Sequence, residues 1–164
     1  MTNQPIHVRP FCLADAGEVE PWLQGPGLSL PPGAARQQWP HRLLADARIV
    51  ARVAVHGARL VGFVRLDSGP DRVADLTLVV SPEYRRRGLG RLLFDAALVS
   101  ARQLGLRQLV ASVDTGNAVA IDFFVDRGFV FEDGAAVGAC TSGRYLLTRI
   151  VHAGDHREPL EIEA

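Results

Sequence analysis

Three consecutive arginines followed by two closely spaced glycines form the segment of this chain best suited to bind an anion. The run Val79–Arg91 reads VVSPEYRRRGLGR, in which a short apolar stretch gives way to a loop and then to an amphipathic segment. This order predicts a strand, a loop and the first turn of a helix, whose amides point outward without helical partners. Gly88 and Gly90 carry no Cβ, so an anion can approach the backbone closely. The segment therefore predicts a phosphate or pyrophosphate site.

Two common phosphate-binding loops do not fit this segment. A P-loop requires Gly-Lys-Ser/Thr, and the chain contains no lysine, since all 18 of its basic residues are arginine. A dinucleotide-binding loop requires a third glycine, where Leu93 stands here. The pattern that fits is Arg/Gln-x-x-Gly-x-Gly/Ala, which runs from Arg85 to Gly90.

A second motif lies downstream, in the run Asn117–Phe129, which reads NAVAIDFFVDRGF. Asn117 is a good helix N-cap and Gly128 a good left-handed helix stop, so the run predicts a short helix with an aromatic face. The run is similar to the Asn-x-x-Ala-x-x-x-Tyr-x-x-x-Gly-Phe motif of the GNAT superfamily of acyl-CoA N-acyltransferases, and the arginine–glycine loop resembles that family's pyrophosphate loop. The resemblance extends loosely from Ile6 to about Val151 and is most specific between Val73 and Phe131.

The resemblance implies acetyl-CoA as co-substrate, no metal, and an amine of a small molecule or protein as acceptor. It implies that the pantetheine arm bonds to backbone groups of Leu78 and Val80, and that an amide near Val79 stabilises the oxyanion. The residues it assigns to acetyl-CoA are Leu78, Val79, Val80, Arg85, Arg86, Arg87, Gly88, Leu89, Gly90, Arg91, Asn117, Phe123 and Phe124.

The general base is assigned to Asp75 by the same resemblance. The run ADLTLVV from Ala74 is similar to the AEFAVVV strand of bacterial protein acetyltransferases in this superfamily, whose Glu acts as base. Asp is one methylene shorter, so a bridging water enters the hypothesis. The alternative, that Asp75 caps the strand or pairs with an arginine such as Arg72, stays open. Some members place a Glu where Ser112 stands, a poor base, and alternation puts Asp114 on the other face from Val113.

Phe124 departs from the family pattern, because many members carry Tyr there as the acid that protonates the leaving thiolate. Phe cannot donate a proton, although it can line the thioester pocket. This departure keeps a second class of function open, an acyl-CoA-binding sensor or degenerate enzyme with little turnover.

Periodicity of apolar residues predicts the elements that must hold these motifs. A long loop over residues 24–40 contains several prolines, and a helical turn near Ala34 to Trp39 stays open within it. A polar tail over 152–164 is expected to fray. The predicted strands cover residues 6–10, 48–56, 60–66, 73–80, 108–113, 129–131 and 145–151, and the predicted helices cover 15–23, 88–104 and 117–127. Pro21, near the end of the first of these helices, is a residue that favours a break or kink there. The resemblance implies an α+β (mixed α/β) GNAT fold in a single domain, residues 1–151. Its mostly antiparallel mixed sheet contains a central splayed parallel pair, strands 73–80 and 108–113, with helices on both faces.

Composition limits the remaining classes of function. The 164 residues carry zero net charge and the arginine run has no aromatic stacking platform, so no nucleic-acid partner is expected. No run of about 18 apolar residues predicts a membrane span. The first residues lack a secretory signal, so a cytoplasmic protein is expected. His152 and His156 are four residues apart without a third ligand, so no metal site is predicted. A homodimer stays open.

Overall fold

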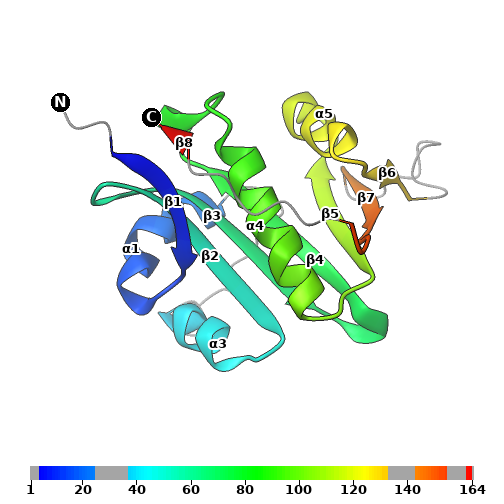
Figure 1. The fold of residues 1–164 in the computed structure, drawn as a ribbon, viewed down its shortest axis with the longest axis horizontal. Coiled ribbons are helices and arrows are strands. Elements are labelled where there is room, and N and C mark those ends of the chain that lie inside the picture. Colours follow the sequence, from blue (N-terminus) through cyan, green and yellow to red (C-terminus); the bar gives the residue numbers. More distant parts are fainter. Residues whose placement is uncertain (1–3, 25–36, 133–142, 155–161, 164) are drawn as a thin grey trace.

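The computed structural model describes residues 4–24, 37–132, 143–154 and 162–163. One mixed sheet with the strand order β6-β7-β5-β4-β3-β2-β1-β8 runs through these residues (Figure 1). Neighbouring strands pair antiparallel except β4 and β5, which pair parallel, as predicted. The strands are β1 (Pro5–Pro10), β2 (Ile49–His56), β3 (Arg59–Ser68), β4 (Val73–Val80), β5 (Gln108–Asp114), β6 (Val130–Phe131), β7 (Arg144–Ile150) and β8 (Ile162–Glu163).

Helices cover both faces of the sheet, which confirms the predicted α+β architecture. The long helix α4 (Leu89–Gln103) crosses one face, and α5 (Ala118–Asp126) lies beside it (Figure 1). On the other face, α1 (Ala16–Val19) and α3 (Trp39–Ala45) enclose a second core with β2 and β3. The sheet is thus sandwiched between two apolar layers, since neither face can be left uncovered without exposing aliphatic side chains.

Helix α4 approaches the sheet closely because its partner strand carries a glycine. A Cβ on Gly62 of β3 would lie 2.6 Å from Cδ1 of Leu93. Leu89, Leu92 and Leu93 are all buried, at the i, i+3 and i+4 spacing of a helix face. This packing fixes the direction of α4 and therefore the position of its N-terminus.

Helix α3 was not predicted. The loop expected over residues 24–40 is wrong for Trp39 and Pro40, which begin α3, and no element was predicted for the rest of that helix. Residues 25–36, which include the first part of the helical turn left open near residues 34–39, lie outside the described part. Pro40 sits in the first turn of α3, where a missing N–H costs no helical hydrogen bond. Trp39 and Leu43, one turn apart, are both buried against β2 and β3.

Two further expectations need correction. The predicted helix over residues 15–23 is a broken series of short turns, with α1 followed by the 3₁₀ helix Glu20–Gln24, as Pro21 favours. The tail does not fray throughout, because Ile162 and Glu163 form β8 and pair with Ile6 and Pro5 of β1. The predicted strands at 73–80 and 108–113 are confirmed as β4 and β5, the latter one residue longer.

Candidate functional site

The parallel ladder between β4 and β5 is short, and both strands continue beyond it. Three pairs make up the ladder, and the last joins Asp75 to Val110. Strand β4 then runs on to Val80 while staying paired with β3, and β5 runs on to Asp114 while staying paired with β7. The two central strands are therefore splayed, as the family resemblance implies.

The splay leaves part of the β4 backbone directed toward β5 without a ladder partner there. The Ser81 amide donates to the Val61 carbonyl at 2.9 Å, and the register places Val79 opposite Phe63. Because alternate residues of an antiparallel strand direct their polar groups to the same neighbour, Val79 bonds toward β3. Leu78 and Val80 point the other way. We call the backbone groups of Leu78 and Val80 the splayed edge.

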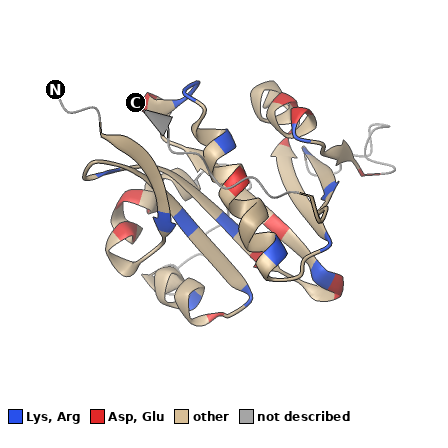
Figure 2. Cartoon of the chain, viewed as in Figure 1, with Lys and Arg blue, Asp and Glu red and all other residues tan. Residues whose placement is uncertain are grey.

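The loop that follows β4 turns sharply into α4. A 3₁₀ turn over Pro82–Tyr84 leads to Arg86, with φ 62°, and Gly88, with φ 79°. Gly88 is the N-cap of α4, in a left-handed conformation that suits glycine. Figure 2 shows the cationic segment of this loop at the start of α4. Arginines, a glycine and the helix N-terminus thus lie together, which is a favourable place for an anion.

The loop residues that were predicted to contact acetyl-CoA differ in how exposed their side chains are. Arg85, Arg86, Arg87, Gly88 and Arg91 are exposed. Leu89 is 1% exposed and packs in the core under α4, so its side chain anchors the helix and only its backbone lies on the loop side.

Gly90 has a packing partner that sequence reasoning did not identify. A Cβ at Gly90 would lie 2.8 Å from Cε2 of Phe123 on α5. The second glycine of the motif therefore lets the two helices beside the splayed strands touch, in addition to any close approach of a ligand.

Helix α5 is fixed by its cap and by an aromatic cluster. The Asn117 Oδ1 accepts from the Ala120 amide at 3.1 Å, which confirms the predicted N-cap. Phe123 is half-buried, and the Arg127 guanidinium carbon lies 3.9 Å from its ring centroid. Phe124 is 7% exposed, with its ring centroid 5.0 Å from that of Phe129. Phe124 is therefore a core residue beneath α5, in addition to any contact that it makes with a ligand.

Asp75 lies on the face opposite α4 and is exposed, since the adjacent Ala74 and Leu76 are buried under α4. It stands directly opposite Asp67 of β3. Partial burial and the charge of Asp67 raise the pKa of Asp75, while Arg65 lowers it. Within the described residues the Asp75 side chain makes no hydrogen bond or ion pair, so the pairing with Arg72 that the sequence left open is not formed.

The other acidic and hydroxyl candidates near β5 already have structural partners. The Ser112 hydroxyl accepts from Nε of Arg144 at 2.7 Å. Asp114 Oδ1 accepts from the Gly116 amide at 2.8 Å and closes the turn that leads to α5. Neither group is arranged as a general base.

Two residues that sequence reasoning missed, His56 and Tyr84, connect the loop to the end of β2. His56, at the end of β2, places Nδ1 3.0 Å from the hydroxyl of Tyr84 in the loop. The pair is 28 residues apart in the chain, so no local pattern could have indicated it.

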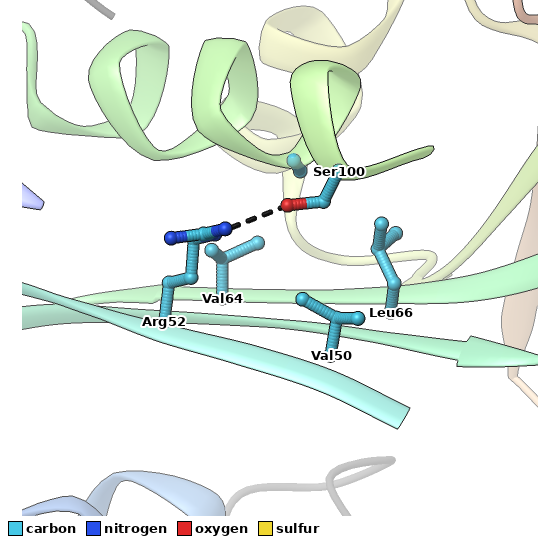
Figure 3. A pocket seen from close by; sticks show the side chains of 6 residues that line it. Val50, Arg52, Val64, Leu66 and Ser100 are labelled. Atoms are coloured by element: carbon cyan, nitrogen blue, oxygen red, sulfur yellow. Dashed lines mark hydrogen bonds between the residues drawn. The ribbon is translucent and has the colours of Figure 1, made fainter. Parts of the chain in front are cut away.

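A separate hollow lies between α4 and strands β2 and β3 (Figure 3). Its lining is mostly aliphatic, and Nε of Arg52 donates to the Ser100 hydroxyl at 3.0 Å across it. It contains none of the predicted site residues. Among the described residues, no group of three or more His, Cys, Asp or Glu side chains could hold a metal, and no helix is long and apolar enough to cross a membrane.

Comparisons with known proteins agree with this geometry. The chain is 38% identical over 64 residues to mycothiol acetyltransferase from Geodermatophilus obscurus, a match that covers 38% of this chain and spans 21% of that relative's length. The fold is similar to that of Ard1 from Thermoplasma volcanium (TM-score 0.71, 26% identity, 90% of this chain and 98% of that one). It is also similar to spermidine N-acetyltransferase from Vibrio cholerae, solved with CoA and spermine (TM-score 0.72, 17% identity, 89% and 95% covered).

A family model gives the assignment for most of the chain. The model of the acetyltransferase (GNAT) family matches residues 17–129, a range that includes β4, the loop, α4, β5 and α5. The splayed strand pair, the glycine loop at the start of α4 and the capped aromatic helix α5 lie inside this matched range. The chain therefore belongs to the acetyltransferase (GNAT) family.

Proposed function

We propose that this protein is an N-acetyltransferase that moves the acetyl group of acetyl-CoA directly to an amine. The observation that carries the proposal is the end of the β4–β5 ladder at Asp75 and Val110, with β4 continuing through the splayed edge into the glycine loop. The amide groups of a pantetheine arm match the free backbone groups of the splayed edge. A pyrophosphate matches the N-terminus of α4 and the arginines beside it. Family membership and a CoA-containing structural neighbour support the same ligand.

In the proposed reaction the acceptor ammonium first loses a proton to the Asp75 carboxylate, directly or through one water. The amine nitrogen then attacks the thioester carbonyl carbon, and the carbonyl oxygen becomes an oxyanion. The amides nearest Val79 that face β5 belong to the splayed edge, so we assign the oxyanion's hydrogen-bond donor to Leu78 or Val80. Collapse of the intermediate breaks the C–S bond and forms the amide. The surplus proton on the amide nitrogen passes through water to the leaving thiolate, because Phe124 cannot supply one.

The acceptor that suits this face of the sheet is an amine that arrives as a cation. Asp75 and Asp67 stand opposite each other on β4 and β3, an arrangement in which two like charges repel. An ammonium group between them relieves the repulsion, and the raised pKa of Asp75 makes it a better proton acceptor. We therefore propose that the acceptor is a small amine that binds in its cationic form, in preference to a neutral amine.

One observation favours the second candidate function, an acyl-CoA-binding domain with little turnover. Phe124 is a buried core residue in place of the usual acid. An acyl-CoA-binding domain with little turnover would retain the splayed edge and the loop and would dispense with the acid.

One assay distinguishes these functions. Purified protein is mixed with acetyl-CoA and a panel of amines, including spermidine and peptides with a free N-terminus, and free thiol is followed over time. We expect amine-dependent thiol release, with the acetylated amine identified by mass spectrometry. Tight binding of acetyl-CoA by calorimetry without thiol release from any amine would favour the binding domain. Absence of binding would reject both functions.

A further inference from the structure

The loop in front of α4 is attached on one side to the hairpin of β2 and β3. The Ser81 amide bonds to Val61 of β3 at its start, and the Tyr84 amide bonds back to the Ser81 carbonyl at 2.9 Å. Farther along, the Tyr84 hydroxyl lies 3.0 Å from Nδ1 of His56. These contacts connect the anion-binding loop to a hairpin that contributes none of the predicted ligand contacts.

The ring of Tyr84 contacts two neighbouring side chains, His56 and Arg87. It meets the His56 imidazole edge to face, with centroids 5.6 Å apart and an interplanar angle of 72°. The Arg87 guanidinium carbon lies 5.2 Å from the Tyr84 ring centroid. Tyr84 and His56 are half-buried, whereas Arg87 is exposed. The half-buried pair therefore gives the exposed arginine a fixed aromatic surface to lie over.

Such a surface matters because an exposed arginine is otherwise free to sample many rotamers. Ordering a long charged side chain costs rotamer entropy, and a cation–π contact offsets part of that cost. The backbone of the same loop also needs support, because Arg86 takes φ 62°, a conformation that is unfavourable for a residue with a Cβ. A contact that orders this loop before a ligand arrives would lower the cost of binding.

We infer that Tyr84, held by His56, is a positioning residue that sets Arg87 for the pyrophosphate of the acyl-CoA. The inference rests on the proposed function, since it concerns the same ligand. Tyr84 and His56 belong neither to the splayed edge nor to the Asp75–Asp67 pair, where the reaction is proposed. The pair therefore acts through Arg87 and affects binding of the nucleotide end rather than the chemical step.

The test uses the full chain with graded substitutions at both positions. Tyr84→Leu removes the ring, Tyr84→Phe removes only the hydroxyl, and His56→Leu removes the hydroxyl's partner, while His56→Gln retains a hydrogen-bonding group. By calorimetry we expect the Kd for coenzyme A to rise about tenfold in Tyr84→Leu and about threefold in Tyr84→Phe and His56→Leu. His56→Gln is expected to recover most of the affinity. Turnover at saturating acetyl-CoA should stay within about twofold of the unmodified protein.

Two controls separate positioning from general loss of structure. S-acetylpantetheine lacks the pyrophosphate, so its kcat/KM should not change in the Tyr84 variants. Tyr145→Phe, at the other tyrosine of the chain, should leave the Kd for coenzyme A unchanged. Tyr84→Leu combined with Arg87→Ala should bind as weakly as Arg87→Ala alone, because the two residues act as a unit.

The outcomes are distinguishable. An unmodified protein that does not bind coenzyme A overturns the proposed function and this inference with it. If the unmodified protein binds coenzyme A, two results overturn the inference alone. One is that Tyr84→Leu binds coenzyme A as tightly as the unmodified protein does. The other is that the effects of Tyr84→Leu and Arg87→Ala on the Kd are additive. Equal losses for coenzyme A and S-acetylpantetheine also overturn it, since they indicate a structural role without positioning of the pyrophosphate.

Discussion

A Cβ placed on Gly90 would lie 2.8 Å from Cε2 of Phe123, so the contact between α4 and α5 requires a glycine at that position. Phe123 cannot easily withdraw, because Arg127 stacks on its ring at 3.9 Å and Phe124 meets it edge to face at 5.2 Å. The two glycines of the loop motif therefore have different physical roles: Gly88 supplies the left-handed backbone, and Gly90 supplies room between helices.

The first prediction follows from that contact. Gly90→Val should lower the free energy of unfolding by about 1–3 kcal/mol, the usual cost of overpacking, and Phe123→Leu should restore part of the loss. Denaturant unfolding of the two single variants and the double variant measures the coupling. Gly17→Val is the control, since a Cβ at Gly17 meets nothing within 4 Å, and its effect should simply add to that of Phe123→Leu. Additive effects for Gly90→Val would contradict the contact.

A second prediction uses Gly88 to test the loop itself. Gly88→Ala forces a Cβ onto a backbone with φ 79° and should destabilise the fold by about 1 kcal/mol. We also expect the Kd for coenzyme A to rise more than about tenfold, because the turn that presents the α4 amides changes. Gly105→Ala is matched in strain, with φ 67° at the far end of α4, and should cost similar stability without changing the Kd. Equal effects of both variants on the Kd would argue against a site at Gly88.

The loop motif shows which parts of the site can be predicted from sequence. Arg85, Gly88 and Gly90 lie close together in one short segment of the chain, and their backbone requirements are local, so their arrangement follows from residue type and spacing. The strands that hold the loop also follow, because β4 and α4 have clear apolar periodicity.

What could not be predicted depends on contacts between distant segments. The role of Gly90 depends on Phe123, which is 33 positions farther along, and that of Tyr84 depends on His56 on a different hairpin. Helix α3 was missed for a related reason. Its seven residues contain a proline, and it is held chiefly by burial of Trp39 and Leu43 against β2 and β3.

The third prediction concerns Phe124. Phe124→Tyr introduces a hydroxyl at a position that is 7% exposed, beside Phe129. We expect turnover to rise by less than about tenfold, equivalent to about 1.4 kcal/mol of barrier, and thermal stability to fall because the buried hydroxyl lacks a ready partner. Steady-state kinetics and thermal unfolding measure the two effects. A much larger gain in turnover would show that protonation of the thiolate limits the natural enzyme.

A fourth prediction addresses Asp75 as the base. Asp75→Asn retains size and polarity but cannot accept the ammonium proton, so turnover at neutral pH should fall by about 100-fold or more, with the Kd for acetyl-CoA unchanged. Stability should not fall. The folded-state pKa of Asp75 is raised above its ordinary value of 3.8, so the folded protein favours the protonated carboxyl. The stability that protonation contributes is lost as pH rises through the folded-state pKa. At neutral pH the carboxylate is therefore the less favourable form for the fold, and replacing it with a neutral amide should not destabilise the fold. If Asp75→Asn instead unfolds most of the protein, and the folded fraction has full turnover per molecule, then Asp75 is a structural carboxylate and not the base.

The last prediction tests the electrostatics around that carboxylate. As pH falls through the pKa of Asp75 the base becomes protonated, so kcat/KM should decline on the acidic side. Asp67→Asn removes the like charge that raises this pKa, so the acidic limb should move to lower pH. Arg65→Gln removes the opposite charge that lowers it, so the limb should move to higher pH. Profiles of kcat/KM for one amine in the three proteins make the comparison. Shifts in opposite directions identify Asp75 as the titrating group, whereas identical limbs would assign the acidic decline to a group distant from both residues.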